Sequence, residues 1–102
     1  MATPLDLRNR RLPDGTPVLA AVGELDLSNI AAFSAAITET RASAPKGTRV
    51  TVDLSGVTYL DSGAINVLFD HVDGVDIVAH PDLMAVLKIS GLSDVGSIRS
   101  AT

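Results

Sequence analysis

The sequence predicts an α/β fold, a single domain over residues 1–102 in which helices pack on a small β-sheet of mixed strand direction. The chain has 102 residues, is 46% hydrophobic and contains no cysteine, so we expect one core that forms without disulfides. Segments with strand patterns alternate with segments of helical spacing. A hairpin signal opens the chain, and the later strands need helical crossovers, which favour parallel pairing.

A β-hairpin is predicted at the start of the chain. Residues 5–8 alternate between apolar and polar, and residues 18–22 form a compact apolar run. Between them, Pro13, Asp14 and Gly15 have the chemistry of a turn. The first two strands should therefore be antiparallel.

The first helix is expected to begin after Ser28 and to continue to about Arg41. Ser28 is a preferred N-cap residue type. Ile30, Phe33 and Ile37 follow at helical spacing. These apolar residues should face the core.

A strand and a short helix are predicted next. Residues 49–54 are rich in β-branched side chains, Ser55-Gly56 should break the strand, and residues 57–60 continue extended. Asp61 or Ser62 then caps a helix that ends near Asp73-Gly74. Its buried face is expected to contain Ile65, Leu68, Phe69 and Val72.

The last third of the chain predicts a strand, a helix and a weak final strand. The strand covers residues 75–79, and the helix follows His80-Pro81 with Asp82 as its cap and ends at Gly91. Val95 and Ile98 should belong to the final strand, with residues 99–102 frayed. The helix is expected to bury Leu83, Val86 and Leu87.

Composition excludes several classes of function. The net charge of −4 argues against a nucleic-acid partner, whose phosphates need lysine and arginine. No apolar run is long enough to cross a membrane, so we expect no membrane partner and a cytoplasmic location. His71 and His80 are expected to be exposed and not catalytic.

No metal or cofactor site is predicted. Asp70, Asp73 and Asp76 are spaced in threes around Gly74, but they lack the alternating ligands and distal glutamate of a calcium loop. A solvated turn is the simpler interpretation. An enzyme would also need a convergent polar pocket, which the pattern does not supply.

The segment from Asp53 to Gly63 is open to a regulatory and to a structural interpretation. Ser62 lies at a strand-to-helix junction, where free backbone N–H groups and the helix dipole would accommodate a phosphate. The added charge could also repel a docking partner. The spacing by itself favours the structural interpretation, in which Asp61 and Ser62 only cap the helix.

Three blocks of the sequence resemble the STAS domain family, and within it the bacterial anti-sigma-factor antagonists. Gly23-Glu24-Leu25-Asp26-Leu27 is similar to the family's GELD element. Residues 52–62, VDLSGVTYLDS, are similar to its hDLSgVxxhDSSG signature, and residues 87–92, LKISGL, to its closing LxhsGL element. Together with the connecting elements, the blocks follow the family's order over nearly the whole chain.

The resemblance implies partner switching without catalysis or a cofactor. Such antagonists bind an anti-sigma factor that is also a kinase-like ATPase, and they thereby release a sigma factor. Phosphorylation of a hydroxyl at the helix start ends the interaction. Tyr59, Leu60, Ile65 and Leu68 are expected in the core, and the partner-binding residues are expected to be Asp26, Ser28, Asp61, Ser62, Gly63 and Asn66.

Two departures from the family pattern affect regulation and partner choice. A gapless alignment places Ser62 on the family's first serine and Gly63 on the usual acceptor. Either Ser62 accepts the phosphate one residue early, or the usual switch is lost, which we favour because one residue turns the hydroxyl by about 100°. The second helix is also shorter than usual, which leaves the partner's identity open. An alternative function is a non-switching STAS module that acts as a scaffold or binds a small ligand such as a nucleotide.

Overall fold

A computed structural model describes residues 5–101 and contains a five-stranded sheet in the order β1-β2-β3-β4-β5. The first strand is antiparallel to the second, and the remaining neighbours are parallel. This confirms the predicted α/β class and the mixed sheet. The strands are β1 (Asp6–Arg11), β2 (Pro17–Leu25), β3 (Val50–Leu60), β4 (Val75–Ala79) and β5 (Ser97–Ser100).

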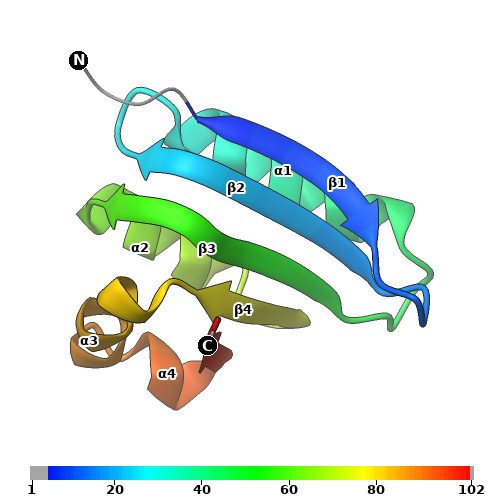
Figure 1. Cartoon of the computed structure of the whole chain (residues 1–102). Helices are drawn as coiled ribbons and strands as arrows, with labels where there is room; N and C mark the ends of the chain where they lie inside the picture. Colours follow the sequence, from blue (N-terminus) through cyan, green and yellow to red (C-terminus); the bar gives the residue numbers. More distant parts are fainter. Residues whose placement is uncertain (1–4, 102) are drawn as a thin grey trace.

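The helices connect the parallel strands in sheet order. They are α1 (Ile30–Ser43), α2 (Ser62–Asp70), α3 (Pro81–Ile89) and the short α4 (Leu92–Val95). Because right-handed crossovers between successive neighbouring strands place every connecting helix on the same side, one face of the sheet stays open. Figure 1 shows α1 and α2 behind the sheet, while the near face over β1, β2 and β3 carries no helix.

The core lies between the sheet and the helices and is mainly aliphatic. Alternate residues of each strand point into it, as the pleat of a sheet requires. Phe33 is its one large aromatic side chain among the described residues that are fully buried. Other fully buried side chains include Leu19, Leu25, Ile37, Leu54, Leu68, Ile77, Leu87 and Leu92.

The third strand is longer than predicted, because Ser55-Gly56 does not break it. β3 runs unbroken for 11 residues, and its register against β2 shifts twice, between Ala20 and Val22 and between Gly23 and Glu24. A Cβ at Gly56 would lie 2.8 Å from Val22 Cγ2, so a glycine permits the close approach. The two shifts change which residues face inward.

This change of facing corrects the prediction for Tyr59. Tyr59 is 50% exposed, so it is not a core residue, whereas Leu60 and Leu68 are buried as predicted. Ile65 is partly buried and packs against the core. A strand that alternated regularly from the buried Val57 would have hidden Tyr59 instead, but the second register shift turns Leu60 inward.

Three details of the helices also differ from the predictions. Asn29, not Ser28, is the N-cap of α1. His80, not Asp82, caps α3, and its Nδ1 accepts the Asp82 N–H at 3.0 Å. Val86, expected to be buried, is 41% exposed, whereas Leu83 and Leu87 are buried.

The end of the chain is more ordered than predicted. Val95 belongs to α4, while Ile98 does lie in the final strand. Arg99 and Ser100 pair with Val78 and Ala79, and the Ala101 N–H donates to Ala79 O at 2.8 Å. Pairing with β4 therefore replaces the expected fraying over residues 99–101, and Thr102 lies outside the described residues. Within the described chain, every helix is too short or too polar to traverse a bilayer.

Candidate functional site

The predicted partner-binding residues meet where β2 and β3 end. Asp26 and Ser28 follow β2, while Asp61 and the start of α2 follow β3. The Asp61 N–H donates to Leu25 O at 3.2 Å, which ties the two junctions together. The carboxyl ends of parallel strands are where open α/β sheets bind their ligands. We call this surface, residues 26–29 and 61–66, the carboxyl edge.

The start of α2 is capped by Asp61. Its Oδ1 accepts the Ala64 N–H at 3.0 Å, so Asp61 is the N-cap and Ser62 is the first helical residue. Ser62 is exposed, and its hydroxyl makes no hydrogen bond to any residue in 5–101. This hydroxyl is therefore open to solvent at a helix N-terminus.

Gly63 is half-buried, and neighbouring side chains restrict the space beside it. A Cβ built there would lie 3.1 Å from Ile30 Cδ1, 3.2 Å from Asp61 Oδ1 and 3.6 Å from Leu27 Cδ2. The first two distances are tighter than ordinary carbon contacts. A serine at position 63 would have to displace Ile30 or the capping carboxylate.

The β2–α1 loop is held by its own hydrogen bonds. Asp26 Oδ1 accepts from the N–H and the hydroxyl of Ser28, and the Asp26 N–H donates to Asn29 Oδ1 at 3.0 Å. Asn29 Nδ2 in turn donates to Glu24 O at 2.9 Å. The side-chain oxygens of Asp26 and Asn29, residue types that often cap helices, thus hold this loop in place.

This loop presents Leu27, a residue that sequence reasoning missed. Leu27 is 80% exposed, although it is a large apolar side chain. The available signal is its place between the polar residues Asp26 and Ser28, two residues beyond the buried Leu25 that ends β2. Asn66, which was predicted in the site, is exposed one turn after Ser62.

The histidines are more constrained than predicted. His71 Nε2 lies 3.0 Å from Ser34 Oγ, across the α1–α2 contact, and the residue is half-buried. Burial, with a smaller contribution from the Arg41 charge, lowers the pKa of His71 below its ordinary 6.5. His80 accepts its capping hydrogen bond as described above, so neither histidine is simply an exposed side chain.

The aspartate cluster is a structural feature. Asp76 accepts from Arg49 Nη2 at 2.8 Å, and this hydrogen bond lowers the pKa of Asp76. Asp73 is exposed in the turn that precedes β4, and Asp70 ends α2. In the part of the chain that the structure describes, no three potential ligand side chains gather as a metal would require.

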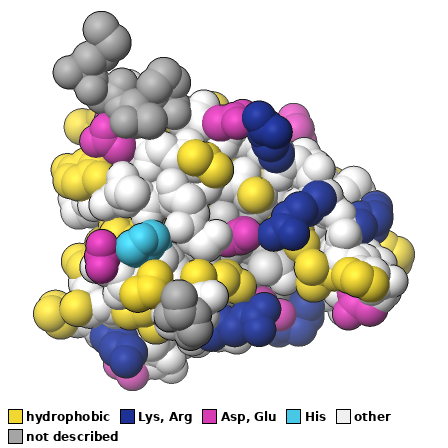
Figure 2. Space-filling view, viewed as in Figure 1, with side chains coloured by type: hydrophobic (Ala, Val, Ile, Leu, Met, Phe, Trp, Pro, Cys, Tyr) yellow, Lys and Arg dark blue, Asp and Glu magenta, His cyan; other side chains and the backbone are white. Residues whose placement is uncertain are grey.

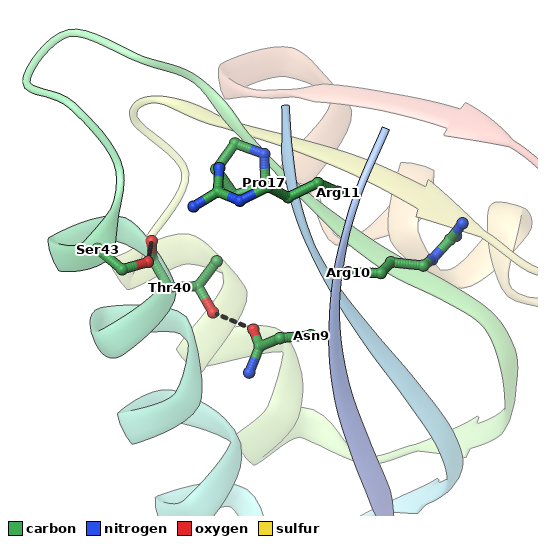
Figure 3. Close-up of a pocket in the computed structure, with 6 residues that line it drawn as sticks. All are labelled: Asn9, Arg10, Arg11, Pro17, Thr40 and Ser43. Atoms are coloured by element: carbon green, nitrogen blue, oxygen red, sulfur yellow. Dashed lines mark hydrogen bonds between the residues drawn. The ribbon is translucent and has the colours of Figure 1, made fainter. Parts of the chain in front are cut away.

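A hollow of about 220 Å³ lies between β1 and the end of α1, away from the carboxyl edge. Figure 3 shows Thr40 donating to Asn9 within it, at 3.0 Å, and Arg10 pointing away. Ser43 donates to Thr40 O at 2.9 Å, so the hydroxyl donors of this hollow are already used. None of the predicted site residues lines it, and the candidate site is a surface suited to docking.

Comparison with known proteins identifies the family and the fold. Residues 9–98 match a protein family described as Mlab, STAS domain. An anti-sigma factor antagonist from Mycobacterium paratuberculosis is 23% identical, with a TM-score of 0.84 over 100% of this chain and 92% of that one. The anti-sigma factor antagonist SpoIIAA in its unphosphorylated form is 17% identical, with a TM-score of 0.71 over 95% and 89%.

The phosphorylated form of SpoIIAA, a Bacillus cell fate determinant, has the same fold. It is 17% identical, with a TM-score of 0.65 over 95% of this chain and 92% of that one. At these identities the three structures show a common fold. No protein of curated function matches the sequence.

Proposed function

This chain belongs to the STAS domain family, and on that premise we propose that it is an anti-sigma-factor antagonist. It binds an anti-sigma factor with a kinase-like ATPase domain and thereby releases a sigma factor. The observation that carries the proposal is the carboxyl edge, where Leu27 projects beside the exposed start of α2. Two structures with the same fold are of proteins named as anti-sigma factor antagonists.

The carboxyl edge has the physical properties of a docking surface. Leu27 offers a large apolar side chain at its centre, and such anchors contribute most of the binding energy in protein interfaces. The hydrogen bonds of Asp26, Asn29 and Asp61 hold both loops before a partner arrives. A rigid surface loses less conformational entropy on binding.

The proposed role requires no catalysis by this chain and no cofactor. The Ser62 hydroxyl makes no hydrogen bond to a general base among the described residues. The Ser34–His71 pair lies at the other end of α2, away from the carboxyl edge. The protein acts by presenting a surface, and an anti-sigma factor partner places it in the cytoplasm.

Regulation differs from the usual switch because position 63 is a covered glycine. A glycine has no hydroxyl to phosphorylate, and the contacts from Ile30 and Asp61 leave little room for a serine. We therefore favour an antagonist without the usual phosphorylation switch. If phosphate is added at this helix start, Ser62 is the acceptor, because its hydroxyl is open to solvent.

The experiment begins with capture of partners from the native host by the tagged chain. We expect an anti-sigma factor with an ATPase domain, identified by mass spectrometry, and release of its sigma factor when the purified chain is added. Recovery of no such protein, or binding without release of a sigma factor, would contradict the proposal and favour a non-switching scaffold.

Phosphorylation is then tested with the purified partner and ATP. We expect no phosphate on the chain, and the same affinity with and without ATP. The matched variant is Ser62→Ala. Phosphate that appears on the wild type and disappears in this variant would show that Ser62 has taken over the switch.

A further inference from the structure

The open face of the sheet carries two rows of side chains that cross all five strands. The pairing register places Arg10, Val18, Thr51, Asp76 and Ser97 side by side in one row. The second row is Arg8, Ala20, Asp53, Val78 and Arg99. Figure 2 looks onto this face, where dark blue and magenta side chains stand near small yellow patches.

A cavity of about 360 Å³ opens on this face, near the amino ends of the parallel strands. The β1–β2 loop forms one wall, and β3, β4 and β5 form the floor and the opposite wall. Its size is within the range of small-molecule sites. The lining residues are Leu12, Thr16, Thr51, Asp76, Ser97 and Arg99.

Thr51 is the unexplained group in this cavity. The residue as a whole is only 8% exposed. Its hydroxyl forms no hydrogen bond within residues 5–101. Every fully enclosed polar side-chain atom in these residues has a hydrogen-bond partner. Because the Thr51 hydroxyl has none, it is not fully enclosed, and we infer that it opens into the cavity that Thr51 lines. This donor faces the cavity, where a ligand or a water molecule can supply its hydrogen-bond partner.

The acceptor groups of the cavity are already occupied, whereas two donors are available. Both carboxylate oxygens of Asp76 accept from Arg49, and Ser97 also hydrogen-bonds to Asp76. Arg99 lies near enough to interact electrostatically with Asp76, but its guanidinium donates to no described group. A matching ligand must therefore bring hydrogen-bond acceptors.

The charges of the cavity also favour an anion. Among the lining residues, Asp76 carries a negative charge and Arg99 a positive one. Arg49, outside the lining, pairs with Asp76 at 2.8 Å and offsets its charge, which leaves the charge of Arg99 in excess. A guanidinium is well suited to carboxylate and phosphate groups because its N–H donors lie in a planar fork. The hydroxyl of Thr51 adds a neutral donor at the floor.

We propose that this cavity binds a small oxyanion, a phosphate or carboxylate group, held by Arg99 and the Thr51 hydroxyl. The hollow beside α1 is different, because Thr40 and Ser43 already donate within the protein. The oxyanion site is independent of partner docking, since it lies at the opposite ends of the strands from the carboxyl edge.

The test is an amide NMR titration of the full chain with inorganic phosphate, and separately with acetate, at constant ionic strength. We expect saturable shifts at Thr51, Asp76, Ser97 and Arg99. Saturation by phosphate alone identifies a phosphoryl ligand, and saturation by acetate alone identifies a carboxylate. Shifts that rise without saturation for both anions would overturn the proposal.

Variants separate a built site from general charge screening. Arg99→Gln and Thr51→Val should each weaken binding, the first by about tenfold or more because it removes a charged donor. Arg8→Gln is the matched control, since Arg8 stands in the same row as Arg99 but pairs with Asp6 at 2.9 Å. An equal loss in Arg8→Gln, or no loss in Arg99→Gln, would contradict the assignment.

Discussion

The two ends of the parallel strands use polar side chains in opposite ways. At the carboxyl edge, Asp26, Asn29 and Asp61 are bonded within the protein and an apolar side chain projects into solvent. At the amino end, the apolar residues are covered, while Thr51 points a donor without a protein partner into a cavity. The carboxyl edge, a rigid surface with an apolar anchor, is therefore suited to a protein partner. The amino end, where hydrogen-bond donors lack protein partners, is suited to a small polar ligand.

The largest expected effect is on partner binding at the carboxyl edge. Leu27→Ser should weaken the complex with the anti-sigma factor by about 30-fold, because loss of a central anchor costs about 2 kcal/mol. Binding is measured by calorimetry with the purified partner. Ile89→Ser is the matched control, because Ile89 is 86% exposed but lies on α3. Equal losses in the two variants would show that Leu27 is no special contact.

The second-largest effect is on the free energy of unfolding. We expect a substitution at the carboxyl edge to lower it and a substitution at the amino end to leave it unchanged or raise it. Asp61→Ala removes the N-cap of α2 and should cost about 1 kcal/mol of unfolding free energy. Thr51→Val removes a hydroxyl without a protein partner, so the Tm should stay the same or rise. Both are measured by thermal and urea denaturation.

Asp61→Asn is the control for the cap, because asparagine caps helices as well as aspartate does. It should retain most of the stability that Asp61→Ala loses. A loss of about 1 kcal/mol or more in Thr51→Val would instead indicate that its hydroxyl is bonded inside the folded protein.

A smaller effect tests the cover over position 63. Gly63→Ala should be more destabilising in the wild type than in an Ile30→Val background, because valine lacks the Cδ1 atom that a new Cβ would approach. The coupling free energy from a double-mutant cycle should be about 0.5 kcal/mol. Additive changes would mean that Ile30 does not limit the space at position 63.

The smallest effect is a pH dependence at the far end of α2. The folded pKa of His71 is lowered by burial and by Arg41, so the unfolded chain takes up a proton first as the pH falls. Stability from this group is fully present above about pH 6.5 and is lost as the pH falls through the folded pKa. His71→Gln should flatten the change in unfolding free energy between pH 7 and 5, measured by urea denaturation.

The aspartates affect stability in a separate, more acidic pH range. Burial opposes the charge of Asp53, but hydrogen bonds from Ser55 and Arg10 hold its pKa below the ordinary 3.8. Such a carboxylate stabilises the fold above its unfolded pKa and loses that contribution as the pH falls further. An unchanged slope between pH 7 and 5 in His71→Gln would show that His71 does not contribute.

Much of the fold could be predicted because its helices, strands and turns follow from patterns of neighbouring residues. The hairpin, the β4 range and the order of strands and helices follow from turn residues and from apolar spacing, which depend on neighbours in the chain. The sequence also predicted that Asp61 and Ser62 lie at the start of a helix, because helix-start chemistry is local. The exposure of Leu27 was missed, since composition does not show which way a loop turns its side chains.

By itself, the sequence determined the fold class, the glycine at position 63 and the hydroxyl at Ser62. Only the tertiary structure decided that Tyr59 faces solvent, that Arg99 joins a strand and that Thr51 and Arg99 line the same cavity. The physical reason is that inward and outward facing depends on register between strands, which two irregularities in β3 reset. The cavity on the open face also depends on the tertiary structure, because the residues that line it are far apart in the chain.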